Sequence, residues 1–581
     1  MIKTILKSVR QYKRNTFITM ALSIGEVIFE IMIPLTMSNL IDYGVYKGNM
    51  DKVLYFGVFL LLEALLQLSV GMLSAHLSAR TAAGFSANLR EDMYRKIQTY
   101  SFSNIDKFST SSLITRLTTD TARVQQSYQM IMRMAIRSPF RMIFAMIVAF
   151  GISRKISLVF VVAIPLLALI LFIIAKIAHK YFEQGFKTYD ELNRIVQENV
   201  HATRVVKTFN QQDHEISKFE KVSLKIYQLF IKAVHTISFN NPAMQLCVYG
   251  IMIFISWFGA KAIIASGNNA ALGLTTGNLM ALIQYSMQIL MSLMMLSMSL
   301  IMIIMSISSA ERIAEVLTEE SDITNPENPV YEVKDGEVEY RDVCFAYSSK
   351  ADKDVLSHIN LHFHSGETIG ILGPTGSAKT SLVQLIPRLY DAKSGEVLVG
   401  GLNVKDYDLN SLRNQVSMVL QKNELFAGTI KENLRWGNPQ ASDEEIVEAC
   451  RMSCADEFIQ QMPDKYDSRI EQGGTNVSGG QKQRLCIARA LLKKPKILIL
   501  DDSTSAVDTR TDALIQKSFK EYIPQTTKII IAQRISSVLN ADQIIMMNDG
   551  RIEDCGKHEE LLKRNSSYRD LYESQNRKGD E

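Results

Sequence analysis

The sequence predicts an all-α transmembrane domain of six spans with long cytoplasmic helical hairpins, joined to an α/β domain that contains a phosphate-binding loop. Two observations predict this division. Residues 1–310 are dense in Leu, Ile, Met and Phe, whereas residues 330–575 alternate between apolar and polar residues as a soluble α/β domain does. In addition, the run GPTGSAKT at 373–380 lies between a strand-like apolar stretch and the start of a helix. A chain of 581 residues has room for both domains.

Composition narrows the possible classes of protein. The net charge of +4 gives no indication of nucleic acid binding and fits basic cytoplasmic flanks of membrane spans. The six cysteines show no disulfide framework. Cys450 and Cys454 lie four residues apart on a predicted helix, but no matching second pair follows, so we do not expect a metal site there.

The first half predicts membrane helices. Residues 1–15 are basic and amphipathic with interspersed charges, which favours an interfacial helix over a signal peptide. Six apolar stretches follow, each near the roughly 20 residues that cross about 30 Å of hydrocarbon. They lie at about 17–42, 54–76, 138–152 with its N-terminal extension, 157–177, 243–265 and 277–305, within a transmembrane domain over 16–320. Three arginines at the start of the third stretch are expected to snorkel or to face protein: Arg133, Arg137 and Arg141.

The connections between the spans alternate in length. Those after spans two and four, 78–137 and 178–237, are long and have a continuous helical pattern, so the helices should extend past the bilayer and return. An even number of spans keeps both termini on the cytoplasmic side. The polar tips near 111–120 and 209–215 are candidates for docking on the second domain, and solvated tips are the alternative.

Three carboxylates lie inside the predicted spans. Glu26 and Glu30 are four residues apart and share one helix face, and Glu63 lies in the second span. A charge there costs about 2.5–3.5 kcal/mol on insertion scales, so these residues should face the bundle interior or a water-filled cavity. They are candidates for attracting cationic cargo or carrying protons. The alternative is a protonated carboxyl that is hydrogen-bonded to a neighbouring helix.

The sixth span is rich in methionine, whose flexible thioether suits a surface that accepts many shapes. Packing or lipid contact is the alternative. The candidate cargo contacts are Met287, Met291, Met295 and Met298.

The run NPENP at 325–329 ends the helical pattern and marks a domain boundary. We expect a linker over 321–334, the second domain over 335–575 and a tail over 576–581. The loop at 373–380 should cradle phosphate, since backbone N–H groups and a helix N-terminus face the anion. Lys379 would reach the outer phosphates, and the Thr380 hydroxyl would hold Mg²⁺. The predicted nucleotide-binding residues here are Gly373, Pro374, Thr375, Gly376, Ser377, Ala378, Lys379, Thr380 and Ser381.

One residue of this loop departs from the usual pattern. Ala378 stands where a glycine is expected before the lysine, and its methyl group fits if the backbone keeps a negative φ. We therefore expect weakened geometry and not a lost site.

Further candidates follow along the chain. Tyr347, 26 residues before Gly373, could stack on an adenine ring, although an ordinary strand-end tyrosine is the alternative. Gln421 ends a strand and could reach a metal ion or water. A second phosphate-binding surface is expected where a helix opens after NVSGGQ, and its residues are Ser478, Gly479, Gly480 and Gln481. One nucleotide seldom needs two such surfaces, unless the second serves a nucleotide held by another subunit.

Two buried strands supply the remaining polar groups. The strand at 497–501 ends in Asp501, which could hold Mg²⁺ through water, and Asp502 follows directly. The strand at 528–532 is followed by Gln533.

The ordered set GPTGSAKT, Gln421, VSGGQ, ILILDDSTSAVD and Gln533 resembles an ATP-binding cassette (ABC) domain with its helical subdomain, and the whole chain resembles an ABC exporter half-transporter. The resemblance implies a dimer that sandwiches two ATP molecules. Each ATP is held by the Walker motifs of one chain and the signature of the other, with Mg²⁺ as cofactor. The hairpin tips would then be coupling helices.

Departures from the family lie at the chemical step. Asp502 stands in place of the glutamate that serves as general base, and its side chain is shorter by about 1.5 Å, which should position water badly. Gln533 replaces the switch histidine and offers no imidazole. Gln472 replaces an acidic residue before the signature, and Val477 replaces its usual leucine. The serine and glycines of the signature are intact.

This asymmetry predicts a slow or inactive Walker site in this chain and a sound signature that completes the site of a different partner chain. The pattern is similar to the degenerate-site subunit of bacterial heterodimeric multidrug exporters. We expect export of hydrophobic, cationic compounds across the bacterial cytoplasmic membrane. The alternatives are a lipid flippase, a peptide exporter or a regulatory subunit without transport of its own.

Overall fold

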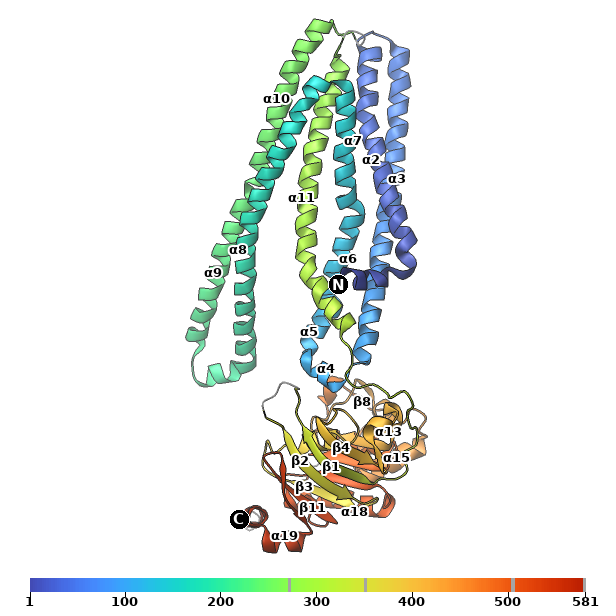
Figure 1. Ribbon diagram of the computed structural model, residues 1–581, viewed down its shortest axis with the longest axis vertical. Coiled ribbons are helices and arrows are strands. Elements are labelled where there is room, and N and C mark those ends of the chain that lie inside the picture. Colours follow the sequence, from blue (N-terminus) through green and yellow to red (C-terminus); the bar gives the residue numbers. More distant parts are fainter. Residues whose placement is uncertain (270–272, 349–352, 503–506, 578–581) are drawn as a thin grey trace. The chain divides into compact units, whose positions relative to one another are not determined.

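The computed structural model describes residues 1–269, 273–348, 353–502 and 507–577 (Figure 1). It divides into two compact units. The transmembrane unit comprises Met1–Gln98 and Thr110–Glu319, and the nucleotide unit comprises Thr99–Ser109 and Glu320–Glu581. The nucleotide unit therefore includes a short segment from the first half of the sequence.

The described part of the transmembrane unit consists of helices and short connections (Figure 1). Among the described residues, six helical segments are long and apolar enough to cross a membrane, as the sequence predicts. Its helices are α1 (Ile2–Leu6), α2 (Lys13–Asn39), α3 (Met50–Gln98), α5 (Thr110–Thr115), α6 (Thr121–Met130), α7 (Ile136–Ile152), α8 (Arg154–Thr208), α9 (Gln212–Ser238), α10 (Asn240–Ser266) and α11 (Thr276–Thr318). A 3₁₀ segment, Lys7–Tyr12, lies between α1 and α2, and π-helical turns at Leu40–Val45, Arg116–Asp120 and Ile131–Ala135 link helices within the spans.

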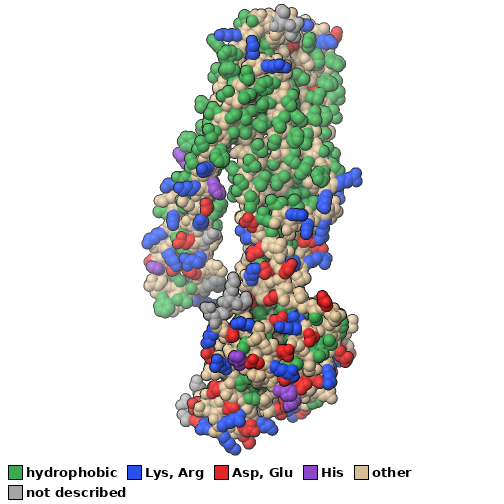
Figure 2. Space-filling view, in the orientation of Figure 1, with side chains coloured by type: hydrophobic (Ala, Val, Ile, Leu, Met, Phe, Trp, Pro, Cys, Tyr) green, Lys and Arg blue, Asp and Glu red, His purple; other side chains and the backbone are tan. Residues whose placement is uncertain are grey.

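The surface of this unit changes along its length. Figure 2 shows hydrophobic side chains over most of the visible face, with Lys, Arg, Asp and Glu gathered toward the end that carries α5 and the α8–α9 turn. The 55-residue α8 and the 49-residue α3 are far longer than a bilayer requires, so they extend beyond it as predicted. Inside the unit, small Ala145 and Ala149 of α7 are fully buried and allow close helix packing.

The nucleotide unit contains a six-stranded sheet in the order β12-β11-β3-β10-β9-β6. Its strands are β3 (Thr368–Leu372), β6 (Val416–Val419), β9 (Ile497–Asp501), β10 (Thr527–Ile531), β11 (Gln543–Asn548) and β12 (Arg551–Gly556). β3, β6, β9, β10 and β11 run parallel, and β12 is antiparallel. Every residue of β3, β9 and β10 is buried, which explains why most of their residues are apolar. The carboxyl ends of the parallel strands meet at one edge, where ligands bind in open α/β sheets.

A second sheet is antiparallel, with the order β2-β1-β4-β5. Its strands are β1 (Val338–Phe345), β2 (Leu356–Phe363), β4 (Ser394–Val399) and β5 (Leu402–Asn403), and a two-residue pair joins β7 (Gly428–Thr429) to β8 (Arg469–Ile470). The helices of the unit are α12 (Lys379–Gln384), α13 (Leu409–Gln415), α14 (Ile430–Arg435), α15 (Asp443–Met452), α16 (Asp456–Ile459), α17 (Gly479–Leu491), α18 (Thr509–Tyr522), α19 (His558–Arg564) and α20 (Ser566–Arg577).

The segment contributed from the first hairpin contains α4 (Phe102–Lys107). The Tyr390 hydroxyl donates to the Asp106 carboxylate across 2.6 Å, and the ring of Phe102 meets that of Tyr390 at 6.0 Å. The part of this hairpin that belongs to the nucleotide unit is therefore 99–109. Residues 111–120 belong to the transmembrane unit, and their docking role stays a prediction.

Asp120, at the end of the 111–120 segment, makes contacts inside the transmembrane unit. Asp120 is fully buried, accepting from Ser309 across 2.8 Å and from Arg312 across 2.7 Å. The second predicted tip, 209–215, lies between α8 and α9 of the same unit, and its docking role stays a prediction.

Candidate nucleotide-binding site

The phosphate loop follows β3 at the carboxyl edge of the parallel sheet. Gly373 has φ +152°, and a Cβ there would lie 2.2 Å from the Met547 carbonyl oxygen, so only glycine fits. The loop wraps around the ammonium of Lys379, which donates to the carbonyl oxygens of Gly373 and Pro374 across 2.8 Å each. Burial lowers the pKa of Lys379. The loop thus holds a cation beside the exposed backbone of 374–376, where an outer phosphate would lie.

The condition for Ala378 is not met. Its methyl group was expected to fit if the backbone kept a negative φ, but φ is +67°, in the left-handed region. The following residue, Lys379, opens α12, and the chain needs this turn to pass from the loop into the helix. An L-residue with a Cβ pays about 1–2 kcal/mol for this conformation, so the alanine stores strain where the family pattern has glycine.

A set of oxygen ligands lies beside the loop. The Thr380 hydroxyl donates to the Asp501 carboxylate across 3.0 Å, and Asp501 is 2% exposed at the end of β9. Burial raises the pKa of Asp501, with a further contribution from the charge of Asp502. A hydroxyl and a carboxylate are hard ligands of the kind that Mg²⁺ prefers. These residues therefore fit Mg²⁺, which would neutralise charge on the bound phosphates.

Asp502, Gln533 and Gln421 are brought together as predicted, from the ends of β9, β10 and β6. The Gln533 amide Nε2 donates to the Asp502 carboxylate across 2.7 Å, and the Gln421 side chain also bonds that carboxylate. Burial raises the pKa of Asp502. Residues 503–506 of the motif that follows lie outside the described residues.

The C-terminal helix supplies a residue that the sequence analysis missed. Gln575 of α20 donates from Nε2 to the Gln533 carbonyl oxygen across 2.9 Å and accepts from the Ile535 backbone N–H across 2.9 Å. Its amide thus clamps the backbone on both sides of Arg534. A glutamine near the chain end carries no motif, so no sequence signal points to it.

Tyr347 lies beside the phosphate loop. Its hydroxyl shares a 2.8 Å hydrogen bond with the Ser381 hydroxyl of α12, and its ring meets the rings of Phe345 and Tyr390 edge-on. The residue is 49% exposed. This arrangement holds the ring next to the loop with exposed surface available for an adenine. Ser381 is buried and bonded to the tyrosine, so we assign it to positioning Tyr347.

The signature residues open α17. The Ser478 hydroxyl accepts from the Gln481 backbone N–H across 3.3 Å, while the Gln481 side chain accepts from the Ser478 N–H across 2.9 Å. This capping box fixes the helix start, with Ser478 and Gly479 exposed. Exposed N–H groups and a hydroxyl at a helix N-terminus can bind an anion brought by another molecule.

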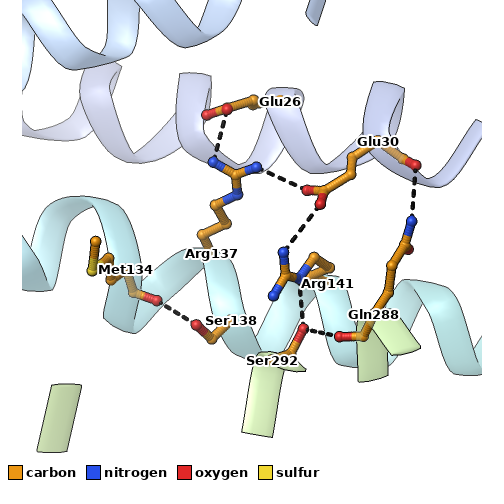
Figure 3. A network of polar contacts seen from close by, with 8 residues as sticks. All are labelled: Glu26, Glu30, Met134, Arg137, Ser138, Arg141, Gln288 and Ser292. Atoms are coloured by element: carbon orange, nitrogen blue, oxygen red, sulfur yellow. Dashed lines mark hydrogen bonds and ion pairs between the residues drawn. The ribbon is translucent and has the colours of Figure 1, made fainter. Parts of the chain in front are cut away.

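Two of the three intramembrane glutamates are paired with arginines (Figure 3). Arg137 of α7 donates to Glu26 across 2.7 Å and to Glu30 across 2.9 Å, both from α2. Arg141 donates to Glu30 across 3.0 Å and to the Ser292 hydroxyl of α11 across 2.6 Å. The network balances two negative with two positive charges and ties three helices together.

Glu63 has a different environment. It is 3% exposed and accepts a 3.0 Å hydrogen bond from the Thr36 hydroxyl of the neighbouring α2. This contact matches the alternative of a carboxyl that is hydrogen-bonded to a neighbouring helix.

The four candidate methionines share the exposed side of α11. Their exposed fractions lie between 37% and 62%, for Met287, Met291, Met295 and Met298. The buried side of the same helix is formed by other residues, among them Tyr285, Ile289 and Leu293. The methionines are therefore not core packing within this chain and are available to lipid, cargo or a second chain.

Comparison with known proteins agrees with this architecture. The family model described as the ABC transporter transmembrane region matches residues 16–294, and the ABC transporter model matches 356–505. The chain is 34% identical to the uncharacterized ABC transporter ATP-binding protein YfiB of Bacillus subtilis, over 98% of both chains. It is 31% identical to the ATP-dependent lipid A-core flippase of Desulfotalea psychrophila, over 85% of both chains. A solved structure of a bacterial Atm1-family ABC exporter with ATP bound shares the fold, with a TM-score of 0.83 and 22% identity over 97% of this chain and 99% of that one.

Six membrane-spanning segments and a phosphate loop in one chain define a membrane ATPase that couples nucleotide to transport. The chain belongs to the ABC transporter family, as an exporter half-transporter that carries its transmembrane and nucleotide-binding parts together. It binds ATP, is a multi-pass membrane protein and acts as one half of a dimer.

Proposed function

We propose that this chain is the degenerate-site half of a heterodimeric exporter in a bacterial cytoplasmic membrane. Its own Walker site binds ATP with Mg²⁺ but hydrolyses it slowly or not at all. Its signature completes the competent site of a non-identical partner chain. The observation that carries this proposal is the pairing of Asp502 with Gln533 at the position where water must be activated.

Two effects oppose each other at Asp502. Burial raises the pKa of its carboxyl, which favours proton acceptance. However, a general base must reach its water at about 2.6–3.2 Å, and the aspartate is one methylene shorter than the family's glutamate. The carboxylate also accepts from Gln533 and is bonded by Gln421. Geometry decides, because a stronger base that does not reach the water gives no catalysis.

The signature supports the second part of the proposal. Ser478 and Gly479 are exposed on a well-capped helix, in the state needed to meet a γ-phosphate held elsewhere. A homodimer would combine two poor sites, whereas a heterodimer retains one complete site.

We propose hydrophobic compounds as cargo, contacted by the exposed methionine side of α11. The ion pairs of Glu26 and Glu30 weaken the argument for a preference for cations, because both carboxylates are already neutralised. A lipid is the second candidate, since one relative is a lipid A-core flippase. Peptide export and a regulatory role without transport remain as further alternatives.

The test is ATPase activity of this chain in lipid, alone and together with the half-transporter encoded beside it. Activity only in the mixed complex, stimulated by hydrophobic drugs, supports the proposal. Comparable activity from this chain alone would contradict the degenerate site. Activity of the mixed complex without stimulation by drugs or lipids, and without transport, would favour the regulatory alternative.

A further inference from the structure

Histidine is concentrated on one strand of the nucleotide unit. The chain has 9 histidines, and three of them fall within seven residues, at His358, His362 and His364. Strand β2 buries Ile359, Leu361 and Phe363, so the alternate positions between them point outward. His362 and His364, two residues apart, therefore share the exposed face. Both histidines are exposed, so this face is accessible.

The Glu337 carboxylate lies close to both of these imidazoles. β1 and β2 are antiparallel, with Glu339 opposite His362 and Val338 opposite Phe363. Continuing this register by one residue places Glu337 opposite His364. The His362 imidazole Nε2 lies 2.7 Å from the Glu337 carboxylate, and the rings of His362 and His364 are 4.4 Å apart.

The three groups can converge on a single ion. One ligand atom from each of Glu337, His362 and His364 lies within 4.8 Å of the other two. In a tetrahedral zinc site the ligand atoms are roughly 3.3 Å apart, since Zn–N and Zn–O bonds are about 2.0–2.2 Å. The two histidines are exposed and can close this difference by side-chain rotation. Two imidazoles and one carboxylate are a ligand set that suits Zn²⁺ and similar transition metals.

The backbone beneath these side chains is fixed by hydrogen bonds. The Gly336 N–H donates to the Ser365 hydroxyl across 3.2 Å, so the residues next to Glu337 and His364 are joined. The Thr527 hydroxyl donates to the Gly336 carbonyl oxygen across 2.6 Å and accepts from the Gly366 N–H across 3.0 Å. A rigid scaffold of this kind lowers the cost of assembling a metal site.

We propose that Glu337, His362 and His364 form a binding site for a divalent transition metal ion of the zinc type on the nucleotide unit. The bound ion joins the start of β1 to the end of β2, with water at the remaining coordination position. This linkage stabilises the sheet immediately before β3, the strand that leads into the phosphate loop. The site is independent of the transport cycle proposed above.

The neighbouring pair provides a matched control. His358 lies on the same strand, and its Nδ1 is 2.7 Å from the Asp342 carboxylate, but this pair holds one imidazole and one carboxylate. Glu339, on the same face, is already paired with Arg341 through two hydrogen bonds of 2.7 and 2.8 Å.

The experiment is a Zn²⁺ titration of the full chain in lipid nanodiscs against a chelating dye, without nucleotide and with an affinity tag that contains no histidine. Wild type should bind one zinc ion that His362→Gln and His364→Gln bind at least about tenfold more weakly. His358→Gln should bind as wild type does. Zinc should also raise the unfolding temperature of the nucleotide unit when His364 is present, but not in His364→Gln. Both proteins carry Trp257→Phe, so that the fluorescence signal comes from Trp436.

Two results would overturn the proposal. Equal zinc affinity in wild type and both variants would mean that the His362–Glu337 contact is only an ion pair. Equal weakening by His358→Gln would mean diffuse binding along the strand. ATP binding measured without zinc checks that each variant is folded, and these exposed substitutions should leave it unchanged.

Discussion

The Gln533 side chain donates a 2.7 Å hydrogen bond to the Asp502 carboxylate, between the ends of two adjacent parallel strands, β10 and β9. The two residues that depart from the family pattern therefore contact each other. Their contact occupies an oxygen that a catalytic base would use to take a proton from water. Because the two side chains are in contact, the effects of substituting them should not be additive.

Lengthening the base tests this relationship. Asp502→Glu should raise ATP turnover at this chain's Walker site by at least about tenfold, because the carboxylate then reaches the water. The measurement is ATPase activity of the complex with a partner whose own phosphate-loop lysine is changed to alanine. Asp502→Asn, which has no base, is the control and should give no increase. If Asp502→Glu also gives none, the limiting defect lies at Gln533 or in the partner's signature.

The clamp from α20 should hold the segment after β10. Gln575→Ala removes two hydrogen bonds to the backbone of Gln533 and Ile535, at a cost of about 1–2 kcal/mol. Hydrogen–deuterium exchange of a peptide covering 533–537 should increase accordingly. Ser574→Ala is the matched control, since the Ser574 hydroxyl bonds only the Leu571 carbonyl oxygen in its own helix. Equal exchange in both variants would show that α20 does not restrain this segment.

The backbone strain at Ala378 can be removed by substitution. Ala378→Gly removes the Cβ from a backbone with φ +67° and should raise the free energy of unfolding by about 1 kcal/mol, because the strain is present in the folded state. Thermal unfolding of the nucleotide-free full chain in nanodiscs measures the change. Ala378→Val should act in the opposite direction, since a β-branched residue tolerates this region even less. A glycine variant no more stable than wild type would show that the alanine is not strained.

The intramembrane network should depend on charge balance. Arg137→Met leaves Glu26 and one oxygen of Glu30 without their cation and should cost about 3–5 kcal/mol of stability. Adding Glu26→Gln should recover much of this loss, because Glu30 keeps its pair with Arg141. Thermal unfolding of the three proteins in nanodiscs measures the effect. A double variant as unstable as Arg137→Met alone would contradict the role of charge balance.

Cargo selectivity tests whether Glu26 and Glu30 of the same network contact cargo. Since both carboxylates are paired, Glu26→Gln with Glu30→Gln should impair export of cationic and neutral compounds alike. A selective loss of cation export would restore the hypothesis that these glutamates contact cargo.

A pH dependence follows from Asp501. Burial raises the pKa of this carboxyl in the folded state above its unfolded value, so the folded state binds the proton more tightly. Its ionised form therefore costs stability at neutral pH, and the cost disappears as pH falls through the folded pKa. Asp501→Asn should raise the unfolding temperature of the nucleotide-free chain at pH 8 by about 2 °C. The advantage should shrink as the pH falls through the folded pKa toward the ordinary value of 3.8. A constant difference across this range would exclude titration as the cause.

Much of the fold could be predicted because its signals are local. A span needs a long apolar run, and the buried strands 368–372 and 497–501 are continuous apolar stretches that end at a glycine loop and a carboxylate. Parallel strands bring their carboxyl ends together, so the meeting of Asp501, Asp502 and Gln533 followed from two short segments, 497–502 and 528–533.

The missed features depend on which segments become neighbours. The sequence placed Glu26, Glu30, Arg137 and Arg141 in spans but could not show that α2 and α7 lie side by side, so their pairing was not inferred. The sign of φ at Ala378 is set by the turn into α12 and not by the residue itself. The hydrogen bond between Gln575 and Ile535 joins residues that are 40 positions apart in the sequence. None of these has a local pattern.

The inclusion of residues 99–109 in the nucleotide unit has a consequence for how such chains evolve. Exchange of genetic material at the linker would transplant Tyr390 without Phe102 and Asp106, its partners from the first half of the gene. Chimaeras made at that junction would combine Tyr390 from one parent with the α4 segment from the other parent. A recombination event that keeps this contact would have to exchange α4 together with the rest of the nucleotide unit.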